Sequence, residues 1–469
     1  MALKWFNTLS RSIQEFAPLD PAGKHVGLYC CGPTVYDFAH IGNWRTFVFA
    51  DLVRRALEFS GYEVKHVMNI TDVDDKIIKR VRETKTPLRE FTGKYEAAFF
   101  EDLKTLNCRP PHETPRATEH IPEIIALIEK LVARGVAYKA ADGSVYFSIE
   151  KYRNCGCNYG QLLKLNFDEH RVGERVASDE YDKESVADFA LWKARALEDG
   201  DVFWKSDSLG EGRPGWHIEC SAMSMKALGE TFDLHLGGED LKFPHHEDEI
   251  AQSEGATGKP FVKHWMHGAH LLVEGKKMSK SLGNFFTLRD LLAKGFTGRE
   301  IRYALLQAHY RESFNFTLDG LLGARTALAR IDECMSKLRE IAGRTIANPD
   351  SQFITKFKEA LDDDLNVSAA WGAIFEWVRE LNRALVANQV SPEQASSAMS
   401  TWRTIGTAVL GINLPGEIEV PWDIAALLDA RQAARKARDF KKSDAIRDEM
   451  KAKGWTIEDT PKGPKLKKL

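Results

Sequence analysis

The chain has 469 residues, more than one hydrophobic core can organise, so about two to four domains are expected. Its hydrophobic content of 43% and charged content of 28% are those of a soluble globular protein, and no apolar run approaches the roughly 20 residues that span a bilayer. The formal net charge of −3 excludes a uniformly basic surface, although it says nothing of local patches. Seven unevenly spaced cysteines and no signal-peptide core lead us to expect a cytoplasmic protein with reduced thiols.

The first part of the chain predicts an α/β fold. Residues 25–31 form a short apolar run typical of a buried strand, residues 46–60 have helical periodicity, and residues 64–70 predict a second strand. Strand, crossover helix and strand make a βαβ unit, which is the building block of a parallel, Rossmann-type sheet. Ligands bind such sheets at the carboxyl ends of the strands, where Cys31 and Thr71 both fall.

Later segments divide the chain into further regions. The α/β pattern covers residues 1–120 and resumes over 206–265, so the mixed segment 121–205 reads as an insertion. A third strand is predicted over residues 264–273, and a lysine-rich loop follows it within the region 266–316. Residues 317–412 predict a bundle of amphipathic helices, and after the linker Leu414-Pro415-Gly416 the module 413–469 predicts two helices and a basic tail.

A phosphate site is predicted where the first strand gives way to a helix. Residues 33–43, which begin at Pro33, carry His40, Gly42 and Asn43. A helix N-terminus offers unpaired N–H groups and partial positive charge, so it attracts phosphate. His40 and Asn43 can donate to a triphosphate, and Gly42 allows close approach to the backbone. Alone, a helix-opening histidine is more often an ordinary cap.

A second motif, Lys277-Met278-Ser279-Lys280-Ser281, lies in a predicted mobile loop. Its lysines would offset the negative charge that develops as pyrophosphate leaves a nucleotide. Alone, it reads as a solvated loop. In this order and βα context the two motifs resemble the signature motifs of class I aminoacyl-tRNA synthetases. Asn43 stands where that family usually has a second histidine, and an amide can donate a hydrogen bond but carries no charge.

Four scattered residues could form a metal site. His245 and Glu249 are four apart on a helix predicted to begin near Pro244, so both lie on one face. Cys31 ends the first strand, and Cys220 lies in a later segment. Two thiolates, an imidazole and a carboxylate make a reasonable zinc sphere. Spacing alone nevertheless favours a surface hydrogen-bonded pair and two core thiols.

Three segments change that balance, because they resemble motifs of the cysteinyl-tRNA synthetase family: Tyr29-Cys30-Cys31-Gly32, Gly215-Trp216-His217-Ile218-Glu219-Cys220-Ser221-Ala222-Met223 and Phe243-Pro244-His245-His246-Glu247. The similarity extends over nearly the whole chain. It implies that Cys31, Cys220, His245 and Glu249 bind one Zn²⁺, which the thiol of the substrate joins. Cys30 points to the opposite face of its strand and is not expected to bind.

The zinc ion would distinguish cysteine from serine. Serine differs from cysteine by one atom, and a shaped pocket separates such near-isosteres by only about 10–200-fold. Zinc prefers a soft thiolate and lowers the pKa of a bound thiol, whereas a serine hydroxyl ionises far less readily.

The resemblance also implies the remaining contacts. The cysteine pocket is expected to comprise Gly32, Thr34, Thr71, Trp216 and His235, and the ATP site His40, Gly42, Asn43, Gly237, Asp240 and Lys280, with Mg²⁺ accompanying ATP. His40, Asn43, Lys277 and Lys280 are expected to be catalytic. The plainer interpretations are that Trp216 belongs to the core and that Thr71 caps a helix.

The expected partners are tRNA(Cys), ATP and L-cysteine, for a monomer that does not bind membranes. By resemblance, residues 1–120 and 206–265 form the catalytic domain, 121–205 a connective insertion, and 266–316 a stem-contact region. The bundle and the C-terminal module would bind the anticodon region, where a basic helix around Arg431, Arg435 and Lys436 suits phosphate contacts. Trp455 could stack on a base or fill a small core.

Two alternatives stay open at this point. A related ligase could join activated cysteine to an amino-sugar, although such relatives typically lack a full anticodon module. A non-catalytic tRNA-binding paralogue could retain a relict active site, although intact lysine and metal motifs argue against it.

Overall fold

The structure is a computed structural model that describes residues 3–163, 188–278, 283–415, 421–437, 439–460 and 463–468. The chain forms two compact units: the first comprises Met1–Ala324 and Glu359–Ala370, and the second Arg325–Lys358 and Trp371–Leu469. Within the described residues, no helix is both long and apolar enough to cross a membrane.

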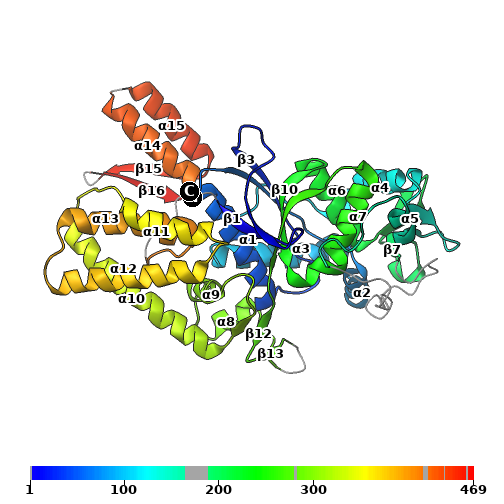
Figure 1. The fold of residues 1–469 in the computed structure, drawn as a ribbon, viewed down its shortest axis with the longest axis horizontal. Helices are drawn as coiled ribbons and strands as arrows, with labels where there is room; N and C mark the ends of the chain where they lie inside the picture. The colour runs from blue at the N-terminus through cyan, green and yellow to red at the C-terminus, as the bar shows by residue number, and fades with distance from the viewer. Residues whose placement is uncertain are drawn as a thin grey trace. The chain divides into compact units, whose positions relative to one another are not determined.

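A four-stranded parallel sheet forms the centre of the first unit, in the order β11-β10-β3-β4 (Figure 1). The strands are β3 (His25–Cys30), β4 (Glu63–Met68), β10 (Phe232–Gly238) and β11 (Val262–Gly268). Helix α1 (Ile41–Phe59) crosses from β3 to β4, as the βαβ pattern predicts. Because chain order reverses between β3 and β10, the ligand crevice of such a sheet lies at the carboxyl ends of these two strands.

Helix α1 begins five residues before the sequence analysis placed it. His40 caps the helix. Its ring nitrogen Nδ1 accepts a hydrogen bond from the backbone N–H of Asn43, and the backbone N–H of His40 donates one to the side-chain oxygen of Asn43. The backbone N–H of Ile41 also donates to Phe286. The periodic apolar pattern starts only later, so periodicity alone could not locate this capped first turn.

The described residues of 1–120 and 206–265 contain four other α-helices: α2 (Asp75–Thr84), α3 (Leu88–Thr105), α6 (Trp216–Leu228) and α7 (Glu247–Thr257), of which α6 contacts β3. A helical turn over Lys242–His246 precedes α7. Asp74 caps α2, so the alternative role of Thr71 as a helix cap is wrong.

The inserted segment has its own antiparallel sheet, in the order β5-β6-β7-β9-β8, which packs with α4 around a shared apolar core. Its elements are α4 (Ile121–Ala133), β5 (Ala137–Lys139), β6 (Val145–Phe147), α5 (Ile149–Asn154), β7 (Phe189–Ala194), β8 (Trp204–Ser206) and β9 (Gly210–Pro214). Helix α4 contacts both α6 and α7, which ties the insertion to the sheet crevice (Figure 1).

Smaller elements complete the first unit. They are the hairpin β1 (Lys4–Asn7) and β2 (Ser12–Glu15), the sheet β13-β12-β14 with β12 (Leu271–Val273), β13 (Lys276–Lys277) and β14 (Phe314–Phe316), and the helices α8 (Leu288–Ala293) and α9 (Gly298–Leu305). The single strand expected over residues 264–273 is therefore two strands.

The rest of the chain is mainly helical, as expected. The helices are α10 (Leu318–Ala342), α11 (Ser351–Asp362), α12 (Val367–Val386), α13 (Pro392–Trp402), which continues as a π-helix over Arg403–Val409, α14 (Trp422–Lys436) and α15 (Phe440–Ala452). The first three extend across the boundary between the two units.

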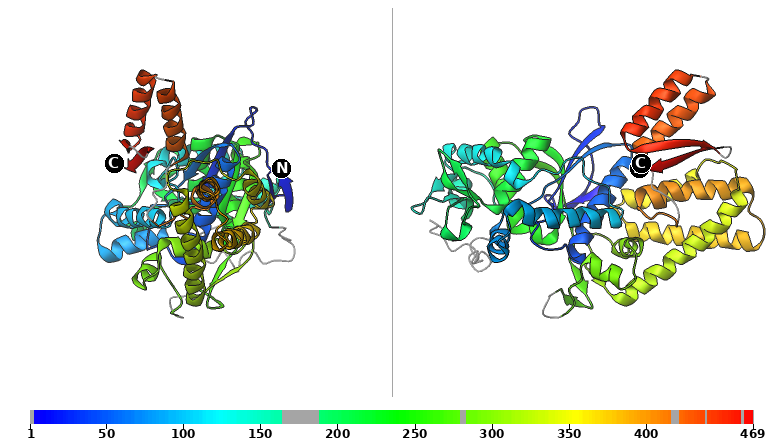
Figure 2. Two further views of the ribbon diagram at one scale, coloured as in Figure 1. Left: turned by 90° about the vertical axis from the view of Figure 1, so that its left-hand side faces the viewer. Right: turned by 180° about the vertical axis from the view of Figure 1, so that it is seen from behind.

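The expected basic tail is instead a hairpin of β15 (Trp455–Thr460) and β16 (Gly463–Lys468), drawn in red with α14 and α15 in both views of Figure 2. Trp455 is buried with Ile424, Ile446 and Met450, so it fills a small core. The expectation that it stacks on a base is wrong for this conformation. The sequence did not indicate this hairpin, because half of the six residues of its second strand are lysine and few apolar residues mark the alternation.

A buried charge cluster fixes α1 to α9. One carboxylate oxygen of Asp51 accepts from Arg55 at 2.7 Å and from Arg302 at 2.5 Å, and the other accepts from the backbone of Arg109 at 2.8 Å. Burial by itself raises the pKa of Asp51, but Arg55 and Arg302 outweigh it and hold this pKa well below its ordinary value. The cluster therefore stabilises the helix that carries the phosphate-site candidates.

We predict that Asp51→Asn destabilises the first unit by about 3–5 kcal/mol, because it leaves two buried guanidinium groups without their carboxylate. The wild-type carboxylate has a lowered folded-state pKa, so its contribution is complete above the unfolded pKa of about 3.9 and is lost as pH falls below it. The gap between the unfolding midpoints of the two proteins should therefore narrow towards acid pH. Glu333→Gln, which removes an exposed ion pair with Lys337, is the control and should keep the wild-type midpoint. Equal midpoints for Asp51→Asn and wild type at neutral pH would contradict the prediction.

Candidate metal and nucleotide site

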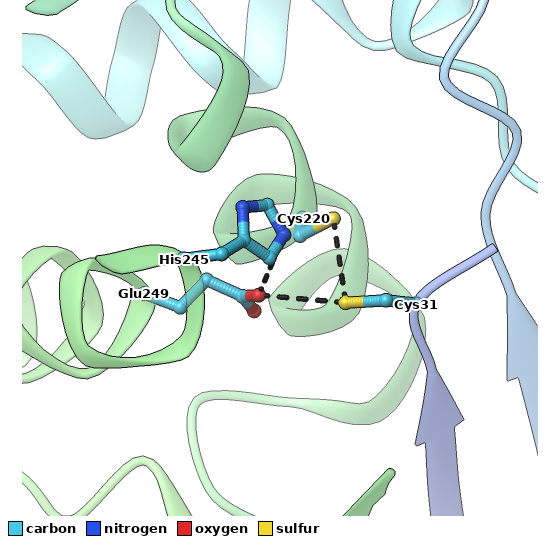
Figure 3. Close-up of side chains that lie close together, drawn as sticks. All are labelled: Cys31, Cys220, His245 and Glu249. Carbon is cyan, nitrogen blue, oxygen red and sulfur yellow. Dashed lines mark hydrogen bonds and ion pairs between the residues drawn. The ribbon is translucent and has the colours of Figure 1, made fainter. Parts of the chain in front are cut away.

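Four donors expected from the sequence lie together at the sheet crevice. Cys31 follows β3, Cys220 lies on α6, His245 in the turn before α7, and Glu249 in the first turn of α7. One potential ligand atom from each lies within 4.8 Å of the others, and all four residues are buried. Figure 3 shows the four side chains pointing towards one another. Helix α7 begins at Glu247 and not near Pro244 as predicted, but the helical turn before it still keeps His245 and Glu249 on one face.

The distances within this donor set are short. The sulfurs of Cys31 and Cys220 are 3.9 Å apart, and the Cys31 sulfur lies 3.6 Å from Oε1 of Glu249. The same oxygen lies 3.1 Å from Nε2 of His245 (Figure 3). These contacts bring two sulfurs, one nitrogen and one oxygen to a common centre, which is the arrangement that a metal ion requires.

Burial sets the charge state of the donors. It raises the pKa of the Cys31 thiol well above its usual value, an effect that the nearby Cys220 reinforces. It lowers the pKa of His245 well below its usual value, so the imidazole is neutral and can offer a lone pair. A bound cation supplies the positive charge that ionises such thiols, so cation binding releases protons here.

A second donor set overlaps the first: Cys31 and Glu249 also lie within 4.8 Å of His235 and His246. Nε2 of His246 is 3.4 Å from the Cys31 sulfur, and Nε2 of His235 is 3.0 Å from Oε2 of Glu249. His235 is expected in the cysteine pocket, whereas His246 has no role in the sequence-based prediction. A signal for His246 was nevertheless present, since it directly follows the candidate ligand His245.

The other residues of the expected cysteine pocket lie around the donor set. The rings of Trp216 and His245 lie with their centroids 4.4 Å apart at a tilt of 30°. Trp216 is 41% exposed, so it can form a wall open to solvent, and its alternative assignment to the core is wrong. Thr71 is buried, and its backbone pairs with Thr34. The N–H of Gly32 donates to the side chain of Asn69, and a Cβ at Gly32 would lie 1.7 Å from the Asn69 carbonyl oxygen. Only glycine fits there.

The two nucleotide motifs meet at the start of α1. A Cβ built on Gly42 would lie 3.2 Å from Cε of Met278, so Met278, the last described residue of the lysine motif, lies against the start of α1. Lys277 itself is exposed on β13. Ser279, Lys280 and Ser281 lie outside the described residues.

The expected nucleotide residues Gly237 and Asp240 lie at the end of β10 and just after it. A Cβ on Gly237 would come within 2.4 Å of the His246 ring, so this glycine leaves room for the histidine side chains. A Cβ on Gly238 would lie 2.4 Å from a carboxylate oxygen of Asp240. Asp240 is exposed and therefore accessible to a ligand.

Comparison with known proteins places the chain in a family. Residues 17–326 match the family described as tRNA synthetases class I (C) catalytic domain, residues 356–415 a DALR domain, and residues 419–464 the cysteinyl-tRNA ligase anticodon binding domain. A cysteine–tRNA ligase from Chlamydia muridarum is 46% identical and is covered, like this chain, over 100% of its length. One from Protochlamydia amoebophila is 47% identical, with 99% of this chain and 98% of the relative covered.

The chain belongs to the cysteine–tRNA ligase family. Membership of this class I synthetase family confirms the resemblance and the fold class that the sequence predicted. The match of residues 419–464 to an anticodon binding domain leaves the amino-sugar ligase and the non-catalytic paralogue without support.

Solved structures agree on the fold. Methionyl-tRNA synthetase of Mycobacterium tuberculosis, in complex with methionyl-adenylate, superposes with a TM-score of 0.62 at 14% identity, over 90% of this chain and 96% of that one. A leucyl-tRNA synthetase ternary complex from Agrobacterium radiobacter gives a TM-score of 0.59 at 11% identity, over 85% of each chain. At this identity the likeness concerns the fold alone.

We predict that Cys220→Ser lowers the amount of metal that copurifies with the protein, because it removes one soft donor from the set. Cys30→Ser is the matched control. Cys30 is equally buried and adjoins Cys31, but its sulfur contacts the Cys31 carbonyl oxygen at 3.6 Å, outside the donor set. Elemental analysis should show reduced metal only for Cys220→Ser. A metal content that is the same in both variants would exclude Cys220 as a ligand.

Proposed function

We propose that this member of the family joins L-cysteine to tRNA(Cys) in two steps. ATP and cysteine give cysteinyl adenylate and pyrophosphate, and a terminal ribose hydroxyl of the tRNA then attacks the adenylate. The buried set of two thiols, an imidazole and a carboxylate carries the proposal, because it is a soft metal site at the crevice where a parallel sheet binds its ligand.

Zinc is the metal that this donor set suits. Zn–S bonds of about 2.3 Å and Zn–N or Zn–O bonds of about 2.0–2.2 Å place tetrahedral neighbours about 3.3–3.8 Å apart. The separations of 3.9, 3.6 and 3.1 Å between neighbouring donor atoms are close to this range. When bound, zinc would take the substrate thiol as a thiolate, which serine cannot match.

The chain's own residues would position the reactants. The wall formed by Trp216 would exclude larger side chains, and Gly32, Thr34, Thr71 and His235 would complete the cysteine pocket. Since adenylate formation needs little covalent help from the protein, most of the acceleration should come from orientation and from stabilising charge.

The start of α1 would hold the triphosphate of ATP. The capped helix N-terminus carries His40, Gly42 and Asn43, and Met278 of the lysine motif lies against Gly42, which supports this proposal. Asn43 is exposed, so its amide can also reach a nucleotide. Lys277 and Lys280 would stabilise the leaving pyrophosphate, Mg²⁺ would accompany ATP, and Gly237 and Asp240 would lie beside the nucleoside.

Other assignments complete the proposal. The DALR-like and anticodon-binding segments would bind tRNA(Cys) along 317–412 and 413–469, with the exposed Arg435 and Lys436 near its phosphates. Arg431 is only 3% exposed, so the expectation that it contacts phosphate is wrong. The boundaries at residues 120 and 316 and a cytoplasmic monomer are proposed on the sequence alone. The boundaries expected at 205 and 265 fall inside β8 (Trp204–Ser206) and β11 (Val262–Gly268), so we place them after β9, at Pro214, and after β11, at Gly268.

Cysteine-dependent ATP–pyrophosphate exchange tests the proposed activity directly. The purified protein should exchange pyrophosphate with cysteine far faster than with serine, and it should then charge purified tRNA(Cys). Elemental analysis of the same sample should find about one zinc per chain. Exchange with serine at the rate seen with cysteine would contradict metal-based selection, and exchange without charging would contradict the tRNA acceptor.

We predict that Lys280→Ala slows exchange by about 10²–10³-fold, because it removes a positive charge that stabilises the leaving pyrophosphate. Its zinc content should stay that of the wild type. Lys276→Ala, a neighbouring lysine outside the motif, is the matched control and should retain wild-type exchange. A near-normal rate for Lys280→Ala would rule out the assigned role.

A further inference from the structure

A second histidine lies directly behind the candidate ligand His245. His217 belongs to the first turn of α6, and its Nδ1 is 2.7 Å from Nδ1 of His245, with the ring centroids 4.9 Å apart. Nε2 of His217 lies 3.3 Å from a carboxylate oxygen of Asp248 on α7. Carboxylate, first imidazole and second imidazole thus form a line that ends at the donor set.

The carboxylate gives this line a direction. An ionised carboxylate only accepts hydrogen bonds, so Nε2 of His217 carries a proton and donates a hydrogen bond to Asp248. A neutral imidazole has one N–H, so Nδ1 of His217 accepts, and Nδ1 of His245 must be the donor. Nε2 of His245 is then left with its lone pair, and this is the atom that faces Glu249 at 3.1 Å.

We propose that Asp248 and His217 are positioning residues that hold His245 as its Nδ1–H tautomer, so that Nε2 is available to bind the zinc ion. The inference rests on the zinc site of the proposed function and extends it to residues outside the donor set. Metal-binding histidines usually donate their other N–H to a carboxylate or carbonyl, and here a neutral imidazole transmits the effect of the carboxylate. We call the line from Asp248 through His217 to His245 the relay. A dication bound to His245 disfavours a positive charge on His217, so the His217 imidazole stays neutral.

The acidic end of the relay is itself held in place. The hydroxyl of Tyr159 donates to the second oxygen of Asp248 at 2.5 Å. Next to it, Glu247 accepts from three successive backbone N–H groups, at 2.6–2.9 Å, of Gly160, Gln161 and Leu162. The loop from Tyr159 is therefore attached to the start of α7, and Asp248 (1% exposed) cannot turn away without breaking these contacts.

A second line of hydrogen-bonded side chains, from His246 through His267 to Thr8, has no group that fixes the direction of its hydrogen bonds. Nδ1 of His246 lies 2.7 Å from Nε2 of His267, whose Nδ1 lies 2.9 Å from the hydroxyl of Thr8. A hydroxyl can donate or accept, so this line can carry its protons either way and does not oblige Nε2 of His246 to present a lone pair to Cys31. The relay ending in Asp248 therefore favours the donor set that contains His245 over the overlapping set that contains His246.

Zinc affinity tests the relay separately from catalysis. Affinity is measured on the full chain by competition with a chromophoric chelator. His217→Phe keeps a ring but removes the acceptor for the His245 N–H, and should weaken zinc binding by about 10–100-fold. His217→Asn returns an acceptor, because its amide oxygen can take the place of Nδ1, and should recover most of the affinity. His264→Phe, another buried histidine that is in neither donor set, is the matched control and should bind zinc as the wild type does.

A cobalt-substituted sample reports the tautomer itself. Proton NMR of the Co²⁺ form of the wild type should show an exchangeable, strongly shifted imidazole N–H from His245, which should broaden by solvent exchange in His217→Phe and reappear in His217→Asn. Equal zinc affinity in wild type and His217→Phe would overturn the relay while leaving the zinc proposal intact. Equal losses in the Phe and Asn variants would also overturn it, since shape and not the acceptor would then matter. A wild-type protein that binds no zinc would instead overturn the proposed function.

Discussion

Buried donors that share one small space govern the chemistry of this molecule. Two thiols, an imidazole and a carboxylate lie within 4.8 Å of one another away from solvent, where unpaired charge is costly. Burial raises the pKa of Cys31 and lowers that of His245, so it favours the neutral form of these two donors. A divalent cation reverses this preference, because the low dielectric that penalises an isolated thiolate strengthens its attraction to the ion. The same attraction distinguishes a sulfur-bearing substrate from one with a hydroxyl.

The sheet explains how donors so far apart in sequence come together. Strands β3 and β10 are neighbours, yet more than two hundred residues separate them, and chain order reverses between them. Cys31 follows one strand, while His245 and Glu249 follow the other. The helix that leads into β10 supplies Cys220. The start of α1 leaves the same edge, so the candidate phosphate site and the donor set belong to one crevice.

Much of this arrangement could be predicted from residues with strong local signals. Apolar runs located β3 and β4, and their βαβ spacing predicted the parallel sheet. The sequence could not place the first turn of α1, since a cap made by His40 and Asn43 leaves no periodic trace. It also missed the C-terminal hairpin, whose lysine-rich strand is stabilised by pairing and by a small core around Trp455. Both errors arise where tertiary or side-chain hydrogen bonds, and not hydrophobic patterning, define an element.

The sequence assigns His245 to the metal only through the family resemblance, because residue type alone does not distinguish the histidines. His217, His245 and His246 lie in or near the motifs that carry candidate ligands, and each has the same capacity to bind a metal. What separates them is the partner of the second ring nitrogen. An acceptor-only carboxylate at Asp248 imposes one proton arrangement along its line, whereas the hydroxyl of Thr8 permits two. Because such partners come from elements distant in the chain, the tautomer of a ligand is a property of the folded site, and the residues that set it leave no motif of their own.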